Sequence, residues 1–282
     1  MDRREIFQRI AAEAAQGSTV FPTSAEVALQ VQRALDDPDC SIDQAARLIM
    51  AEPLLATRVV AMANSVAYNR SGHDIADIQQ AVARLGFRVV RALATAVAVR
   101  QLSGAPAAPR FHALATQLWE HTAHVAALAH VIARRATRLD PDAAFFAGIV
   151  HEVAGFYLLS RAHEFPGLFD GESGNWMAAW HGEGEALVGR AVLRMLGVPD
   201  PAQDAVEAYW QGYLALPPLS LGDTLLLAED LAPITSPLYS GERESRVAAE
   251  GSLDVMLGES SLAELLKESA AEVASLTASL HF

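Results

Sequence analysis

Hydrophobic residues recur along most of this chain with the spacing of helices, and no segment alternates apolar and polar residues as a half-buried strand does. Capping-box motifs, in which Ser or Thr is followed three residues later by Glu or Gln, begin predicted helices at Thr23, Ser41 and Ser261. Turn residues such as Asp37-Pro38-Asp39 separate the helical segments. The pattern therefore predicts an all-α fold.

Proline and glycine set further helix boundaries. Pro53 suits the first turn of a helix that ends near Asn64, and Gly86 suits the end of a helix that begins at Ile78. Short helices are expected after Thr23 and Ser41, and an amphipathic segment near the N-terminus. The other predicted helices cover residues 87–102, 111–138, 142–162, 176–196, 202–213, 219–232 and 261–280.

A linker of small residues and prolines, 103–109, divides the chain into two helical lobes. We expect an N-terminal extension (1–19), an N-terminal helical lobe (20–105), a second helical lobe (110–236) and a C-terminal helical extension (237–282). The terminal helix has one apolar face, which is expected to pack on its own domain. The bridging residues 237–260 leave room for an exchange between two copies, so a homodimer stays open.

Composition and charge narrow the class of partner. The 282 residues include 34 acidic and 21 basic side chains, giving a net charge of −13 that opposes binding to nucleic acid or an anionic membrane. Cys40 is the only cysteine, which excludes an intrachain disulfide and fits a reducing compartment. The N-terminus does not resemble a signal peptide. We therefore expect a cytoplasmic protein with neither nucleic-acid nor membrane partners.

An ionisable pair, His151-Glu152, lies inside the long apolar run from Ala143 to Leu159. Burying such groups costs free energy unless a charged partner, hydrogen bonds or a metal compensate them. The run is too short, and its charges too central, for a membrane span. The pair is therefore a candidate metal or catalytic position in a buried helix.

A third candidate, His121, lies on the apolar face of the preceding helix. That face consists of residues at steps of four and three: Leu114, Leu118, His121, Val125, Leu128 and Ile132. His124 lies beside the face, and His130 is half a turn away and is expected to be solvated. Arginines at 134, 135 and 138 are explained as complements to the dipole at the end of this helix. A histidine on an apolar helix face is more often a hydrogen-bonded core residue than a metal ligand, and position alone does not make His121 a ligand.

Several motifs resemble the HDOD domain, a bacterial signalling family and a divergent branch of the HD phosphohydrolase superfamily. The most specific matches are Pro53–Ser65, which reads PLLATRVVAMANS, and Ile78–Gly86, which reads IQQAVARLG. Trp119-Glu120-His121, His181–Gly189 and Leu196–Pro199 also match, and the resemblance covers about residues 20–235. It implies a two-lobed helical HDOD domain, with an N-terminal helical lobe and an HD-like helical bundle.

The resemblance also assigns roles to the ionisable residues. In the HD superfamily a His, an adjacent His-Asp pair and a later Asp converge on one or two metal ions, which activate a water to attack a phosphate ester. These positions correspond here to His121, His151-Glu152 and Glu229, and His181 is a candidate pocket residue.

The catalytic signature departs from the HD pattern at several of these positions. Glu152 and Glu229 stand where Asp is usual, Gly155 stands in the place of a Lys, and Trp210-Gln211 replaces tandem histidines. The extra bond of a Glu is about 1.5 Å long, and a displacement near 1 Å costs on the order of a hundredfold in rate. We therefore expect the four HD positions to be vestigial, with no catalytic residue, no metal and no cofactor.

The resemblance implies a non-catalytic regulatory or scaffold protein that binds signalling proteins of two-component or cyclic-di-GMP networks. Two alternatives stay open. The first is a metal-dependent phosphohydrolase with His121, His151, Glu152 and Glu229 as metal ligands and His181 as a phosphate contact. The second is a nucleotide-binding sensor that does not hydrolyse its ligand.

Overall fold

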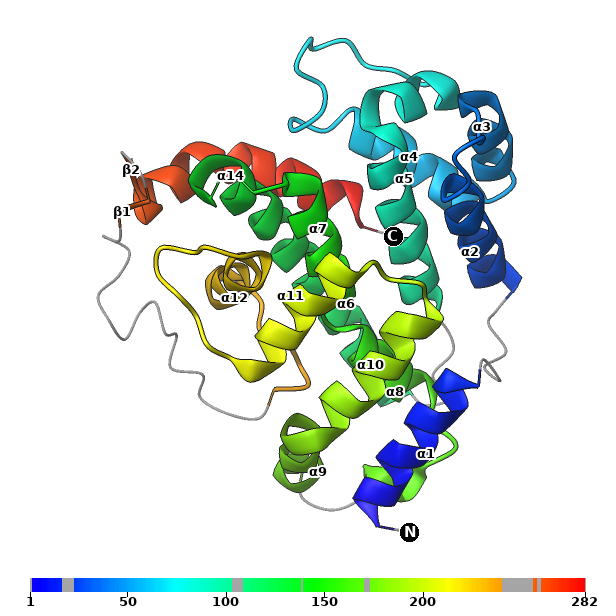
Figure 1. The fold of residues 1–282 in the computed structure, drawn as a ribbon, viewed down its shortest axis with the longest axis vertical. Coiled ribbons are helices and arrows are strands. Elements are labelled where there is room, and N and C mark those ends of the chain that lie inside the picture. Colours follow the sequence, from blue (N-terminus) through cyan, green and yellow to red (C-terminus); the bar gives the residue numbers. More distant parts are fainter. Residues whose placement is uncertain are drawn as a thin grey trace.

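The structure is a computed structural model that describes residues 2–16, 23–102, 109–137, 139–169, 173–239, 256–257 and 260–281. The regular secondary structure of these residues is almost all helical (Figure 1), which confirms the predicted fold class. Several sequence-based expectations lie outside the described residues. They are the side chains of the capping box at Thr23, most of the linker 103–109, Arg138 and most of the bridging segment 237–260.

The N-terminal lobe consists of four helices that lie together in Figure 1: α2 (Thr23–Leu35), α3 (Ile42–Met50), α4 (Pro53–Ala63) and α5 (Ile78–Leu102). The capping box at Ser41 forms with both of its reciprocal hydrogen bonds. At the start of α4, the Glu52 side chain accepts from the Leu55 amide, and Pro53 fills the first position. Gly86 adopts φ 77°, which interrupts α5 where a helix end was predicted.

The second lobe contains α6 (Pro109–Ile132), η1 (Ala133–Thr137), α7 (Pro141–Val150), α8 (Val153–Ser160), η2 (Pro166–Leu168), α9 (Ser173–Ala179), η3 (Trp180–Gly184), α10 (Glu185–Met195), α11 (Asp200–Gln211) and α12 (Leu221–Leu231). Helix α6 packs on α7, α12 and the C-terminal helix. Gly148 permits the close contact of α7 with α6, because an added Cβ would lie 2.4 Å from the Ala126 Cα.

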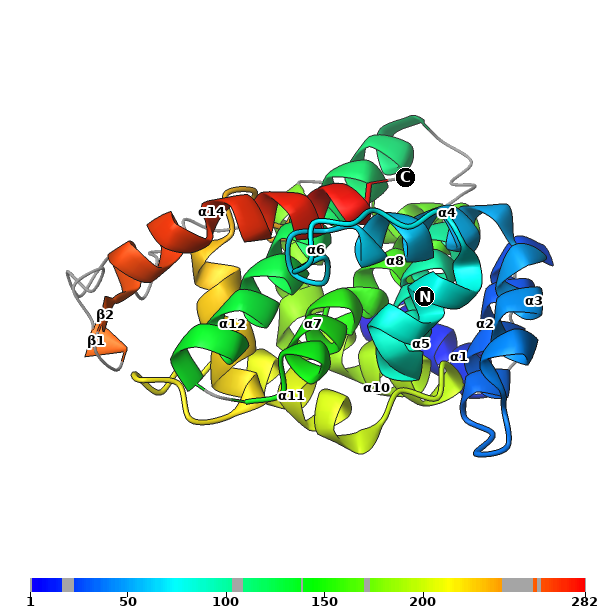
Figure 2. The same ribbon diagram turned by 90° about the horizontal axis from the view of Figure 1, so that it is seen from above.

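The terminal helices pack on the lobes. Helix α1 (Arg3–Ala15) lies along α10 and η3, and α14 (Leu262–Ser279) lies on α6 and α4 (Figure 2). The capping box at Ser261 begins α14, and the helix packs on its own chain as expected. Before it, β1 (Met256–Leu257) and β2 (Ser260–Ser261) form a short antiparallel pair that the hydrophobic pattern did not predict. The domain boundaries stay predictions.

The prediction of one continuous helix over residues 142–162 is wrong. A turn at His151-Glu152 separates α7 from α8, and Glu152 leaves helical geometry at φ −98°, ψ 13°. The His151 ring bonds the Gly148 carbonyl, which would otherwise be an unpaired group at the end of α7. The segment Pro141–Ser160 has the length and apolarity of a membrane span, but 89% of its most apolar stretch is buried inside the structure. Burial in the core accounts for its composition.

The expectation that His130 is solvated is also wrong. Its side chain is buried between the rings of Tyr68 and Phe145, at centroid distances of 5.8 and 6.2 Å. The pattern on one helix could not reveal this, because α6 is covered by several other helices. A polar position on a central helix is therefore no sign of exposure.

The arginines after α6 contact the C-terminal helix. Arg134 pairs with Glu272 at 2.7 Å and Arg135 pairs with the same carboxylate at 3.3 Å. Glu272 is buried, and both arginines are about one-third exposed. These ion pairs fasten α14 to η1, a role beyond the dipole complement that the sequence indicated.

We expect Glu272→Gln to lower the free energy of unfolding by about 1–2 kcal/mol, because partly exposed ion pairs contribute less than fully buried ones. Urea denaturation measures the change. The matched control is Glu268→Gln, whose side chain is 70% exposed and lies 4.0 Å from Arg135. The control should change stability by less than about 0.5 kcal/mol, and equal effects of the two substitutions would contradict the role of Glu272.

Stability should also depend on pH through His130. Burial is the main cause that lowers the pKa of His130; Arg134 adds to the decrease, and Asp142 and Glu272 oppose it. Below the pKa of His130 in the unfolded chain, about 6.5, this side chain binds a proton in the unfolded state but not in the folded state. The free energy of unfolding therefore falls with decreasing pH, by at most about 1.4 kcal/mol per unit for one proton.

His130→Gln removes this titration. We expect the variant to lose less stability than the wild type between about pH 7 and pH 5, a range set by the reference pKa. Urea titrations at each pH measure the difference. Parallel curves for the two proteins would contradict a lowered pKa of His130.

Candidate functional site

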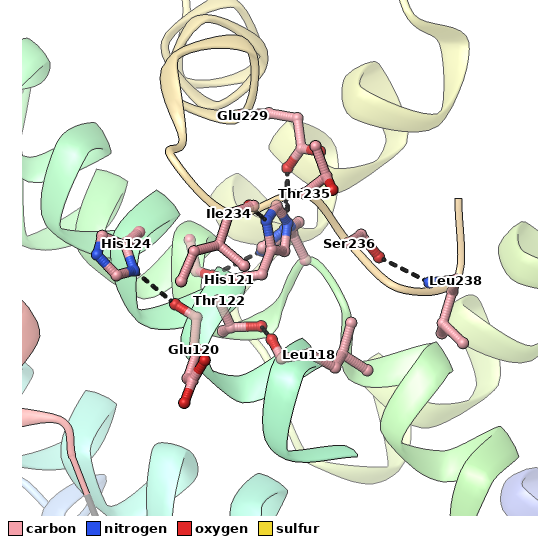
Figure 3. A network of polar contacts seen from close by, with 12 residues as sticks. Leu118, Glu120, His121, Thr122, His124, Glu229, Ile234, Thr235, Ser236 and Leu238 are labelled. Atoms are coloured by element: carbon pink, nitrogen blue, oxygen red, sulfur yellow. Dashed lines mark hydrogen bonds and ion pairs between the residues drawn. The ribbon is translucent and has the colours of Figure 1, made fainter. Parts of the chain in front are cut away.

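Three of the residues singled out in the sequence meet in the second lobe. His121 comes from the middle of α6, His151 from the turn between α7 and α8, and Glu229 from the last turns of α12. All three are buried, and the exposed fraction of both histidines is 0%. One nitrogen or oxygen of each lies within 4.8 Å of the others, an arrangement suited to a metal ion. Figure 3 shows the His121 ring facing the Glu229 carboxylate.

The three facing atoms form a small triangle. The His121 Nε2 lies 3.0 Å from the Glu229 Oε2, and the His151 Nε2 lies 3.4 Å from the same oxygen. The two Nε2 atoms are 3.3 Å apart. Two imidazole rings therefore converge on one buried carboxylate oxygen.

Backbone carbonyls fix the orientation of both rings. The His121 Nδ1 lies 2.7 Å from the Ile234 carbonyl oxygen, and the His151 Nδ1 lies 2.7 Å from that of Gly148. A carbonyl oxygen only accepts, so each Nδ1 is the donor and each Nε2 faces Glu229 with either a lone pair or a second proton. An arrangement of lone pairs and a carboxylate requires positive charge at its centre, from a proton or a metal ion.

The pKa values reflect this pairing. Burial alone would raise the pKa of Glu229, but the charge and hydrogen bonds of His121 and His151 hold it well below its usual range. Burial opposes the charged form of His121, yet the Glu229 carboxylate raises the pKa of this histidine above its ordinary value. The folded protein therefore favours a negative Glu229 beside positive charge.

The donor set fits a divalent metal ion. Imidazole and carboxylate ligands bind zinc at about 2.0–2.2 Å, so two such ligands in a tetrahedral site lie about 3.4 Å apart. The observed separations of 3.0–3.4 Å agree with that requirement. His121, His151 and Glu229 would be the protein ligands. Three protein ligands leave a fourth tetrahedral position for water, as in catalytic zinc sites, whereas structural sites are closed by four protein ligands. In this chain, however, both histidines have no exposed surface.

Glu152 is not part of this triangle. It begins α8, and its carboxylate lies toward Gly155, where an added Cβ would be 3.2 Å from the Glu152 Oε2. Its charge still acts on the triangle, because Glu152 contributes to the raised pKa of His121. The structure therefore brings together three of the four expected HD positions.

His181 lies in a second polar cluster. Its Nδ1 is 3.2 Å from the Glu185 Oε2, and its Nε2 is 2.8 Å from the Leu238 carbonyl oxygen. Burial is the main cause that raises the pKa of Glu185, and the charge of Glu152 adds to the increase. Glu185 is buried, although charged residues of this type are usually exposed. The i, i+4 spacing from His181 was the available signal for the contact.

Two arginines of the second lobe, Arg161 and Arg190, pair with carboxylates. Arg161 pairs with Glu13 and Glu164, and Arg190 forms two hydrogen bonds with Glu207. A phosphate ester needs such cations around its free oxygens. These pairs leave Arg161 and Arg190 poorly placed for that task.

Comparisons with known proteins agree with this architecture. The model of the HDOD domain matches residues 21–211. No curated protein matches the chain. Among solved structures, a protein of Shewanella amazonensis SB2B named as a candidate metal-dependent phosphohydrolase is 23% identical, with 99% of each chain covered and a TM-score of 0.75.

Two further structures are similar. An HDOD domain protein of Geobacter sulfurreducens with unknown function is 22% identical, with 98% of this chain and 97% of that chain covered and a TM-score of 0.60. A protein of Marinobacter aquaeolei VT8 named as a candidate signal transduction protein is 20% identical, with 93% and 58% covered and a TM-score of 0.56. At these identities the likeness concerns the fold.

Removing the shared carboxylate tests the structural importance of the cluster. We expect Glu229→Ala to lower the free energy of unfolding by about 3–5 kcal/mol, because it leaves two buried imidazoles without their charged partner. Glu183→Ala is the matched control, since the Glu183 side chain is 65% exposed. Urea denaturation compares the two, and a change below about 1 kcal/mol for Glu229→Ala would contradict a structural role.

Proposed function

Because this chain belongs to the HDOD domain family, we propose that it is a non-catalytic regulatory or scaffold protein of bacterial signal transduction that acts by binding other proteins. The closure of the His121–His151–Glu229 cluster carries this proposal. A phosphohydrolase centre must admit a phosphate ester and an attacking water to its metal. Here the two histidines are fully buried, and one of them bonds the backbone at Ile234.

The replacement of the family's lysine also supports a non-catalytic role. Gly155 provides no cation, and the side chain of Leu238 fills the space beside it, since an added Cβ would lie 2.4 Å from a Leu238 methyl carbon. Glu152, the second residue of the degenerate motif, is not one of the three donors of the triangle, and its carboxylate lies near Gly155. The two positions therefore contribute packing and buried charge in place of a substrate contact.

A bound divalent ion is compatible with this role. His121, His151 and Glu229 would hold it, and it would supply the positive charge that their lone pairs require. In the closed site, such an ion would cross-link α6, α12 and the turn after α7. The residues themselves orient the rings and exclude water whether the charge comes from a proton or from a metal.

Metal-dependent phosphohydrolysis is the second candidate, and the geometry of the donor triangle is the observation that favours it. A bound ion would then lower the pKa of a water, with His181 as a phosphate contact. A nucleotide-binding sensor without hydrolysis is the third candidate. The structure supports both of these candidates less well than protein binding, because Arg161 and Arg190 pair with carboxylates and the histidine cluster is buried.

The partners remain part of the proposal. The family resemblance favours signalling proteins of two-component or cyclic-di-GMP networks in the cytoplasm, and the net charge of −13 disfavours nucleic acid and membrane surfaces. We also propose that the protein can form a homodimer.

The substitution His151→Asn distinguishes a protein-binding role from a catalytic role. The Asn amide keeps a donor near the Gly148 carbonyl but lacks the Nε2 that faces Glu229. We expect the wild type to hydrolyse nucleotides and cyclic dinucleotides with added Mn²⁺, Fe²⁺ or Zn²⁺ no faster than the variant does. We also expect the folded variant to restore the signalling phenotype of a deletion strain of the native host.

Thermal unfolding first verifies that the His151→Asn protein is folded. The expected result is restoration of the phenotype by wild type and variant alike. Stoichiometric metal in the wild type, together with turnover that the substitution abolishes, would overturn the regulatory proposal in favour of the phosphohydrolase.

A further inference from the structure

A short segment after α12, Ile234–Tyr239, crosses over the polar cluster, and we call it the strap. It belongs to no helix or strand of the described chain. Its two ends are attached to histidines: the Ile234 carbonyl accepts from His121, and the Leu238 carbonyl accepts from His181. Figure 3 shows the strap running past His121 from Ile234 to Leu238.

Two weaker contacts lie along the strap. The Gln117 side chain is 3.4 Å from the Thr235 carbonyl oxygen, and the ring of Tyr239 lies 4.8 Å from that of His181. Tyr239 and Thr235 are exposed, whereas Leu238 is 1% exposed. The strap thus has a solvent-exposed outer side and two buried side chains, Ser236 and Leu238, of which Leu238 is the larger and the apolar one.

Leu238 fills a space that the sequence leaves empty in α8. An added Cβ on Gly155 would be 2.4 Å from the Leu238 Cδ1 but 3.2 Å from the nearest atoms of Glu152 and Leu118. Only the contact with Leu238 falls below the separation that real Cβ atoms tolerate. A side chain from the strap therefore occupies the volume beside Gly155.

We propose that the strap is a gate whose plug is Leu238 and whose opening gives small polar solutes, including a divalent cation, access to His121 and His151. Two observations support the gate: the strap has no regular secondary structure, and its carbonyls at Ile234 and Leu238 accept hydrogen bonds from His121 and His181. Segments attached in this way open locally at a lower cost than the unfolding of the domain. The buried polar groups beneath it are the ones that an opening would hydrate.

This inference does not depend on the regulatory role proposed above. A gate serves a structural ion, a sensed ligand and a phosphohydrolase centre equally well. Its test therefore measures access to the histidines, and neither turnover nor partner binding enters the readout.

The experiment measures the rate at which diethyl pyrocarbonate modifies each histidine, by peptide mass spectrometry of the folded full-length chain. His112 and His281 are exposed and serve as reactive references. His130 is the matched buried control, because it lies on α6 with His121 but contacts Tyr68 and Phe145 in place of the strap. Modification of His130 reports opening of the whole domain.

Two single variants open the gate in different ways. Leu238→Ala removes most of the plug, and Gly155→Ala pushes it outward while otherwise favouring helix α8. We expect each to raise the reactivity of His121 and His151 about tenfold with His130 unchanged, as local opening requires. In the double variant the methyl group added at position 155 fills part of the space that Leu238→Ala empties, so its histidines should react more slowly than those of either single variant.

Wild-type reactivity of His121 and His151 in either single variant would overturn the gate. A parallel increase at His130 would also overturn it, because the opening would then be global. A double variant as reactive as Gly155→Ala would show that the methyl group acts on something other than Leu238, with the same consequence.

Discussion

A carboxylate buried in a protein requires positive charge beside it, and the arrangement of the second lobe around Glu229 follows from that requirement. Helix α12 carries the carboxylate, α6 brings His121, and the end of α7 brings His151. Each ring uses its Nδ1 on a backbone carbonyl, so each is held with Nε2 toward the same oxygen. The cluster thus ties together three elements that are far apart in the sequence.

The same requirement can be met by a bound metal ion or by hydrogen bonds and a proton alone. A set of two imidazoles and a carboxylate is suited to a metal, but it is equally a way to satisfy three buried polar groups. Which of these roles dominates depends on access from solvent. In this chain the strap accepts hydrogen bonds from His121 and His181, and Arg161 and Arg190 pair with carboxylates.

Features that depend on neighbouring residues in the sequence could be predicted well. The capping box at Ser41, the helix start at Pro53 and the interruption at Gly86 all follow from local backbone chemistry, and the structure has each of them. The convergence of His121, His151 and Glu229 came from a family resemblance. Features set by distant contacts escaped prediction, since the burial of His130 depends on other helices that cover α6. The strap was equally hidden, because the space beside Gly155 exists only once α8 and the strap lie together.

Gly148 has two structural roles, and only glycine can fill both. Its carbonyl holds the His151 ring, and its lack of a side chain lets α7 approach the backbone of α6 at Ala126. The distance between those helices is also the distance between the two elements that carry His121 and His151. The distance between the two imidazole rings is therefore set by the packing of α6 on α7. A substitution in the core of this lobe would thus change the affinity of the cluster for a proton or a metal ion without altering any of its three side chains.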